Sequence, residues 1–206
     1  MTATLHRTAL ASAALRGDAG SVDALATAWL PTVYAWCHRL GGPGIDAEDA
    51  AHEALISMCR NLGRLTAPEA FPSWMFAICR GVVANHRRRA WFRRWIPSAL
   101  GERISPSDGP ERVAQTAETA DLVWKILDEL SAAHREVLVL CELEERSAAD
   151  VGLLLGAPTG TVKSRLRLAK EAFRAVAVRR GVQDLAVGTT DSGSFEREME
   201  VADGRP

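Results

Sequence analysis

The C-terminal half of the chain contains a stretch rich in basic and hydroxyl side chains. Lys163, Ser164 and Arg167 carry donors that fit base edges in a DNA major groove, because Lys and Arg suit guanine O6 and N7 while Ser serves either base type. Arg165 and Lys170 are better suited to phosphate contacts. The predicted duplex-DNA contacts are Thr161, Lys163, Ser164, Arg165, Arg167 and Lys170. The alternative is a solvated basic face on an ordinary helical hairpin.

Two short helices would have to position these side chains. Ser147, with Asp150 three residues later, is typical of a helix start, and apolar residues then recur at helical spacing. The Gly-Ala-Pro segment 156–158 ends that helix, and Thr159 can cap a second one that is apolar on one side and basic on the other. The pattern therefore predicts a helix-turn-helix, whose second helix fits the major groove.

A second basic group is interleaved with aromatic residues in the segment FPSWMFAICRGVVANHRRRAWFRRW, residues 71–95. Cations neutralise phosphates, and aromatic rings stack on unpaired bases for roughly 1 to 3 kcal/mol each. This pattern indicates single-strand binding by Arg80, Asn85, His86, Arg87 and Arg88. The alternative is that the rings belong to the core and the arginines only face solvent.

Acidic residues crowd the first two turns of a helix predicted to begin after Asp46. The helix dipole favours each such charge by about 0.3 to 1 kcal/mol, so part of this cluster needs no function. Its density predicts a docking surface for a basic partner, made of Asp46, Glu48, Asp49, His52 and Glu53. A metal-dependent hydrolase or nuclease is the other interpretation. However, Ile56 stands where an HExxH zinc helix needs its second His, so we do not expect a metalloenzyme. We assign no catalytic residue, no metal and no cofactor.

The hydrophobic periodicity predicts an all-α protein of two small helical domains joined by a flexible linker. In the first domain a helix is expected to be interrupted or restarted near Pro31. We divide the chain into an N-terminal extension at 1–20 that could form a frayed helix, a helical domain at 21–95, a Pro- and Gly-rich linker at 96–118, a helix-turn-helix domain at 119–180 and an acidic, disordered tail at 181–206.

The net charge of −1 conceals strong segregation of acidic and basic segments, which suggests several different partners. The 4 cysteines are far apart, lie in apolar helical patterns and show no metal-ligand spacing. We therefore expect buried free thiols in a reducing cytoplasm, and neither a disulfide nor a zinc site. No apolar run approaches the roughly 20 residues that span a bilayer, so we expect a cytoplasmic protein without stable membrane insertion.

The order of these segments is diagnostic. An acidic helix, a basic-aromatic helix and a linker are followed by SAAHREVLVLCELEERSAADVGLLLGAPTGTVKSRLRLAKEAFR. This order resembles a bacterial RNA polymerase sigma factor of the extracytoplasmic-function (ECF) type in the sigma-70 family. The similarity spans residues 21–180 and is most specific at GTVKSRL, with independent support from DAEDAAHEAL and FPSWMFAICRGVVANHRRR.

The resemblance implies a sigma factor that binds core RNA polymerase and directs it to promoters without any chemical step of its own. The acidic helix would dock on the clamp helices of the polymerase largest subunit. The loop 65–73 and the basic-aromatic helix would capture the melted non-template strand of the minus-ten element, holding an unstacked base in a pocket. The helix-turn-helix would read the duplex minus-thirty-five element, and an anti-sigma factor is the expected inhibitor.

Four positions depart from the family pattern. His52 stands where Gln is usual, Gly81 where Asn is common, Gly152 where Ala is typical and Leu168 where Arg is frequent. The main rival function is a dimeric helix-turn-helix regulator that binds a duplex operator. That reading leaves the acidic helix, the basic-aromatic helix and the linker without a role, and the chain shows no dimerisation heptad.

Overall fold

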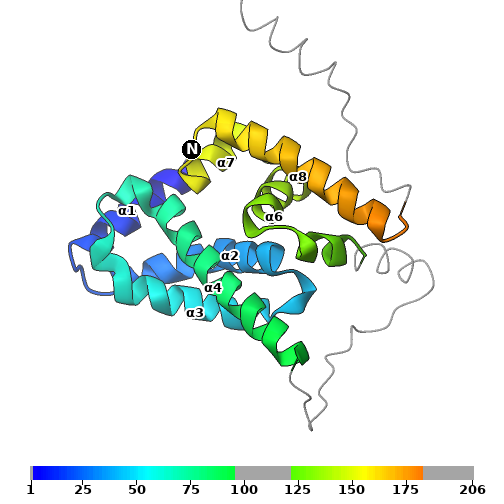
Figure 1. The fold of residues 1–206 in the computed structure, drawn as a ribbon. Helices are drawn as coiled ribbons and strands as arrows, with labels where there is room; N and C mark the ends of the chain where they lie inside the picture. Colours follow the sequence, from blue (N-terminus) through cyan, green and yellow to red (C-terminus); the bar gives the residue numbers. More distant parts are fainter. Residues whose placement is uncertain (1, 96–121, 183–206) are drawn as a thin grey trace, which may run out of the picture.

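The computed structural model describes residues 2–95 and 122–182. The predicted linker at 96–118 and nearly all of the predicted tail lie outside these residues. Every regular element in the described ranges is helical, which confirms the all-α prediction (Figure 1). The helices are α1 (Thr2–Leu15), α2 (Ser21–Gly41), α3 (Ala47–Asn61), α4 (Phe71–Trp95), α6 (Ala132–Leu138), α7 (Ala148–Leu155) and α8 (Thr159–Arg179), and residues 122–129 are also helical.

Short turns connect these helices. They are η1 (Gly42–Gly44), η2 (Leu62–Arg64) and η3 (Pro68–Ala70), together with the wider turn η4 (Val139–Leu143) that continues α6. None of the helices in the described ranges is both long enough and apolar enough to cross a bilayer.

The first helix has a structural role that its Ala-rich sequence did not reveal. α1 packs along α2 and against η3, with Ala11 fully buried and Ala14 nearly so. The Arg7 guanidinium lies 4.9 Å from the centre of the Trp29 ring, a distance typical of a cation–π contact. α1 is therefore part of the protein core, although its residues carry no chemical signal in the sequence.

α2 runs without a break from Ser21 to Gly41, so the predicted interruption near Pro31 is wrong. Proline removes one hydrogen bond of a helix ladder, but Pro31 lies on the exposed side. The residues around it, Trp29 and Val33, are buried against the neighbouring helices and hold both halves of α2 in line. Tertiary packing thus overrides the local break.

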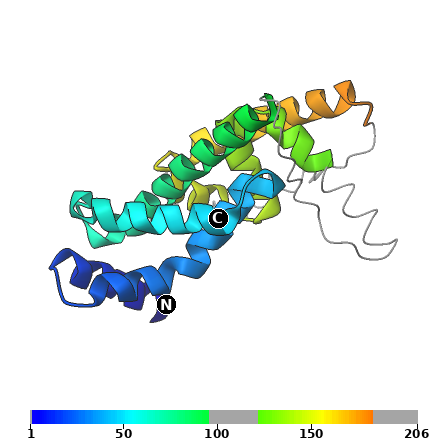
Figure 2. The same cartoon turned by 90° about the horizontal axis from the view of Figure 1, so that it is seen from below.

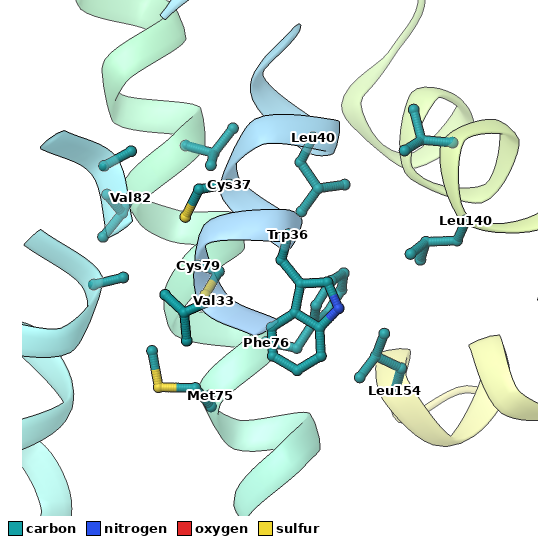
Figure 3. Packing of buried hydrophobic residues seen from close by; sticks show 14 of the residues in the cluster. Val33, Trp36, Cys37, Leu40, Met75, Phe76, Cys79, Val82, Leu140 and Leu154 are labelled. Carbon is teal, nitrogen blue, oxygen red and sulfur yellow. The ribbon is translucent and has the colours of Figure 1, made fainter. Parts of the chain in front are cut away.

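α3 and α4 complete the N-terminal group of helices. Asp46 caps α3 as predicted, because its Oδ1 accepts hydrogen bonds from the backbone N–H groups of Glu48 and Asp49 at 2.9 and 3.0 Å. Figure 3 shows the centre of the core, where side chains of α2 interdigitate with side chains of α4. The buried residues there include Val33, Trp36, Cys37, Leu40, Met75, Phe76, Cys79 and Val82.

The C-terminal helices contain a half-buried cation, Arg135. Arg135 donates from Nε to the carbonyl oxygen of Leu127 at 2.9 Å and from Nη2 to that of Leu130 at 3.0 Å. Burial lowers the pKa of Arg135 to about 10, so the guanidinium still carries its charge at neutral pH. These bonds tie α6 to the end of the preceding helical segment, and Ser131 caps α6 by accepting from the N–H of His134.

The two groups of helices pack against each other. α4 contacts α3 on one side and α7 on another, and buried residues of both groups form one continuous apolar cluster. Figure 1 places α7 and α8 above α2 and α4, and Figure 2 shows the same assembly from below. We call the contact between the helices α1 to α4 and the helices after residue 121 the seam.

The thiol prediction is only partly right. Cys37 and Cys79 are fully buried, but Cys59 is exposed and Cys141 is half-buried. A hydrogen bond between the two buried thiols lowers the pKa of Cys37 and raises that of Cys79, and burial raises the latter further. All four are free thiols. Cys59 falls on the solvent side of α3 because the inner face of that helix is occupied by Ala51, Ala54 and Met58.

Candidate nucleic-acid interface

The turn between α7 and α8 fixes the geometry of the helix-turn-helix. Ser147 caps α7 by accepting from the N–H of Asp150 at 3.1 Å, as predicted. α7 ends at Gly156, whose φ of 62° is the left-handed conformation that glycine adopts without steric cost. The chain then folds back closely enough for the N–H of Ala157 to donate to the carbonyl oxygen of Gly152 at 2.9 Å.

Gly152 itself is required by this close approach. A Cβ at that position would lie 2.7 Å from the carbonyl oxygen of Ala157, which is inside any normal contact distance. An Ala at this position would force the turn or the helix to shift. The tight turn sets the position of α8 relative to α7.

α8 has two distinct faces. Val162, Ala169 and Phe173 are buried against the rest of the C-terminal helices. The opposite face presents the exposed side chains of Thr161, Lys163, Ser164 and Arg167 near the start of the helix. The residues expected to meet base edges therefore lie together on the solvent side of the second helix, in the first turns after the Gly156 turn.

Three of the predicted duplex contacts are partly buried or already paired with a carboxylate. Arg165 is half-buried, and Lys170 pairs with Glu142 of η4 at 2.9 Å with only 19% of its side chain exposed. Arg167, although exposed, pairs with Glu171 one turn further along α8 at 2.6 Å. An exposed pair of this kind contributes little stability, so Arg167 can exchange its carboxylate for DNA at low cost.

The exposed end of α4 carries groups suited to single-stranded nucleic acid. Arg88 is exposed and donates to the side-chain oxygen of Asn85 at 3.0 Å. Trp91 and Phe92 are each 53% exposed, and their ring centres lie 5.1 Å apart in an edge-to-face arrangement. The sequence pattern predicted that aromatic rings of this segment stack on unpaired bases, but the predicted contact residues did not name these two. Their exposure adds them to the candidate strand contacts.

Arg80 and Arg87 differ from Arg88, because both point across the seam. Arg80 Nε donates to Glu136 Oε1 at 2.9 Å, and Arg87 pairs with Asp128 while donating from Nη1 to the carbonyl oxygen of Gly41 at 2.8 Å. Both guanidinium groups are thus occupied by acceptors from the protein itself.

His86 is buried rather than open to a nucleic acid. Its Nε2 lies 2.8 Å from Glu53 Oε2, and its Nδ1 lies 4.0 Å from Asp49 Oδ2. The acidic helix and the basic-aromatic helix, which the sequence treats as separate surfaces, are therefore joined at this residue. Glu48, Asp49 and His52 remain exposed on α3, whereas Asp46 is engaged as its cap.

A cavity of about 280 Å³ lies beside the loop at 65–73 that was expected to hold an unstacked base. Its walls come from that loop, from Trp74 and Arg80 of α4, and from Leu154 to Gly156 at the end of α7. Within residues 2–95 and 122–182, no cluster of three or more His, Cys, Asp or Glu side chains is arranged to hold a metal ion.

Comparison with known proteins decides among the functional classes. The profile described as Sigma-70 region 2 matches residues 25–93, and the profile described as Sigma-70, region 4 matches residues 120–173. The "ECF RNA polymerase sigma factor SigC" of Mycobacterium tuberculosis is 31% identical over 169 residues, which cover 82% of this chain and 89% of that protein. The chain belongs to the ECF sigma factors.

Other relatives agree with this assignment. The sigma factor is 25% identical over 168 residues to SigW of Bacillus subtilis, covering 77% of this chain and 90% of that protein. A solved structure of CnrH in complex with the cytosolic domain of CnrY superimposes with a TM-score of 0.56 at 17% identity, covering 84% of this chain and 97% of CnrH. At that identity the likeness concerns the fold alone.

Proposed function

We propose that this sigma factor binds core RNA polymerase through α3, captures the melted minus-ten strand through α4 and reads the duplex minus-thirty-five element through α8. The observation that carries the proposal is the exposed start of α8, where Lys163 and Ser164 follow a tight glycine turn and back onto a buried apolar stripe. This geometry suits insertion of the helix N-terminus into a major groove.

The docking part of the proposal is supported by charge. Glu48, Asp49 and His52 are exposed on the first two turns of α3, and Glu53 is half-buried beside them. A surface of this kind attracts the basic clamp helices of the polymerase largest subunit. The His86 to Glu53 contact gives His86 a supporting role on this surface, in place of a direct contact with DNA.

The strand-binding part is supported by the exposed end of α4. Arg88 supplies a charge for phosphates, Asn85 a side-chain amide, and Trp91 and Phe92 supply rings on which unpaired bases can stack. Residues 21–95 would then act as one unit and residues 119–180 as the other, with 96–118 as the connection. Arg80 and Arg87 join the strand contacts only after they leave their carboxylate partners.

The sigma factor would perform no chemical step, because the polymerase carries the catalytic site. We expect it to work in the cytoplasm, where polymerase and promoters are. We also propose an anti-sigma factor as inhibitor, since the structurally similar CnrH is bound to the cytosolic domain of CnrY. Purification from the native host without a stoichiometric companion would count against that partner.

The direct test is run-off transcription with sigma-free core RNA polymerase on fragmented genomic DNA of the source organism. New transcripts that start downstream of two spaced sequence elements are the expected result. Silence in this assay, combined with specific binding to duplex DNA by a dimer, would favour the operator-binding regulator instead.

Matched substitutions within α8 sharpen this test. Lys163→Ala should lose about 1 to 3 kcal/mol of binding at particular base pairs of the minus-thirty-five element. Arg174→Ala is the control, because Arg174 is also exposed on α8 but lies roughly 16 Å further along the helix axis. Equal, sequence-independent losses in both variants would contradict base reading by the start of α8.

A further inference from the structure

A cavity of about 350 Å³ lies where α1, α2 and α7 meet. Its volume is at the lower end of the roughly 300 to 1,000 Å³ that small-molecule sites in proteins enclose. The side chains that decide its chemistry are Arg7, Trp29, Trp36, Phe71, Arg146 and Leu154. None of them is among the residues predicted to contact polymerase or DNA.

The charged groups in the cavity wall are both cations. Among the described residues that form this wall, none is Asp or Glu. The Arg7 guanidinium lies over the Trp29 ring and pairs with no carboxylate within the described ranges. Arg146 donates from Nε to Glu144 Oε2 at 2.6 Å, and this bond leaves its two Nη groups for another acceptor. The wall therefore attracts an anion and repels a cation.

Two buried hydrogen-bond donors of the same wall lack acceptors. Trp29 is 5% exposed and Trp36 is 3% exposed, and the indole N–H of each is buried without a partner among the described residues. Figure 3 shows the nitrogen-bearing edge of Trp36 on the side of the ring that faces Leu154. Buried polar groups are nearly always paired in native proteins, so two unpaired donors beside one cavity point to a bound molecule with acceptor oxygens.

The rest of the wall is apolar and largely aromatic. The Phe71 ring lies 5.0 Å from the Trp29 ring, and the Trp29 ring lies 5.9 Å from the Trp36 ring, both in tilted arrangements. Leu154 adds an aliphatic surface from α7. Surfaces of this kind pack well against a planar ring. A small inorganic anion would satisfy the donors but would leave these apolar surfaces without contacts.

We propose that this cavity binds a small aromatic carboxylic acid in its ionised form. The carboxylate accepts hydrogen bonds from Arg7 and Arg146, and the ring packs against Phe71 and Leu154. Hydrogen bonds from guanidinium groups to a carboxylate are among the strongest in proteins. The sigma factor would thus have a small-molecule site in addition to its polymerase and DNA contacts, and this proposal does not depend on promoter recognition.

Isothermal titration calorimetry on the full chain at neutral pH tests the ligand class. The probes are phenylacetate and 3-phenylpropionate, each paired with its neutral amide, and acetate serves as the acid without a ring. At least one aromatic acid should bind saturably at one site, its amide more weakly by roughly ten- to a hundredfold, and acetate without measurable heat. Saturable binding of neither aromatic acid, or equal binding of the amide or of acetate, would overturn the proposal.

A substitution at Arg7 tests the location. Arg7→Gln should weaken binding of the aromatic acid by roughly ten- to a hundredfold, because one guanidinium is lost. Arg16→Gln is the matched control, since Arg16 directly follows α1 but pairs with Asp18 at 3.0 Å and has 64% of its side chain exposed, outside the cavity. Circular dichroism verifies that both variants keep the fold. Unchanged affinity in folded Arg7→Gln would place the acid elsewhere and refute the assignment.

A photoaffinity probe locates the site without any substitution, so the test does not depend on whether Arg7→Gln folds. Irradiation of 4-azidophenylacetate expels N2, and the nitrene that forms inserts into neighbouring C–H or N–H bonds. Mass spectrometry should find the label on the tryptic peptides 17–39, 65–80 or 147–163, which carry the cavity wall, and excess phenylacetate should suppress it. Labelling confined to other peptides, or labelling without suppression, would contradict the proposal. Run-off transcription is an independent readout, so failure of either proposal leaves the other in place.

Discussion

Replacing Gly152 with Ala tests how closely the helix-turn-helix is packed. Two effects of opposite sign compete. Alanine is preferred over glycine inside a helix by roughly 0.5 to 1 kcal/mol. Against this, the new Cβ would lie 2.7 Å from the carbonyl oxygen of Ala157, and crowding of this kind costs about 1 to 3 kcal/mol.

The steric effect should win, because the crowded atom belongs to the backbone. The N–H of Ala157 is held by the carbonyl oxygen of Gly152 at 2.9 Å, so the peptide cannot rotate away without losing that bond. We expect Gly152→Ala to lower the free energy of unfolding by about 1 kcal/mol, the difference between the middle values of the two ranges. Duplex promoter binding should weaken as well, since the turn positions α8.

Gly81→Ala is the matched control. Gly81 also lies within a helix, but it is exposed on α4 and nothing would approach an added Cβ within 4 Å. Only helix propensity acts there, so this variant should gain roughly 0.5 to 1 kcal/mol. Thermal unfolding followed by far-ultraviolet circular dichroism should therefore shift in opposite directions, by roughly 2 to 4 °C per kcal/mol for a chain of this size. Stabilisation by both substitutions would refute the close approach at Gly152.

Three further outcomes are expected. Asp46→Ala should lower the free energy of unfolding by about 0.5 to 2 kcal/mol in urea titrations, because two backbone N–H groups lose their acceptor, whereas an unchanged midpoint would show that Asp46 does not cap α3. Phe76→Ala should lose about 3 to 5 kcal/mol in the same assay, since the ring is fully buried between α2 and α4, and a loss below 1 kcal/mol would contradict that packing. A thiol reagent on the native protein should modify exposed Cys59 first, then Cys141, whose pKa is raised by burial, and reach Cys37 and Cys79 only on unfolding; mass spectrometry would reveal a different order.

Most of the local signals in the sequence were reliable. The exception is Thr159, which does not cap α8, because Pro158 occupies the N-cap position and no side chain accepts a hydrogen bond there. Asp46 and Ser147 cap the helices that they were predicted to start, and Gly156 ends α7 in the left-handed conformation. Each of these features depends on a hydrogen bond or a dihedral angle within a few residues, which the sequence specifies directly. The helix-turn-helix and the all-α fold follow from the same kind of signal.

The features that were predicted wrongly, or not predicted at all, depend on residues far apart in the sequence. The break near Pro31 was wrong because buried neighbours on either side hold α2 straight. The engagement of Arg80 by Glu136 joins positions 56 apart in sequence, and that of His86 by Glu53 joins positions 33 apart. A pattern of charges along one helix shows that arginines are available. It does not show which carboxylate from a distant part of the chain pairs with them.

The packing of α1 bears on how this protein is divided for experiments. The matched sigma-70 region 2 profile begins at residue 25, yet Ala11 is fully buried and Arg7 lies over the Trp29 ring. A fragment cut at the profile boundary would leave the apolar side of α2 open to water, and exposed patches of this kind promote aggregation. Binding measurements on the isolated N-terminal half should therefore use a fragment that retains the chain from its first residues, so that loss of folding is not mistaken for loss of binding.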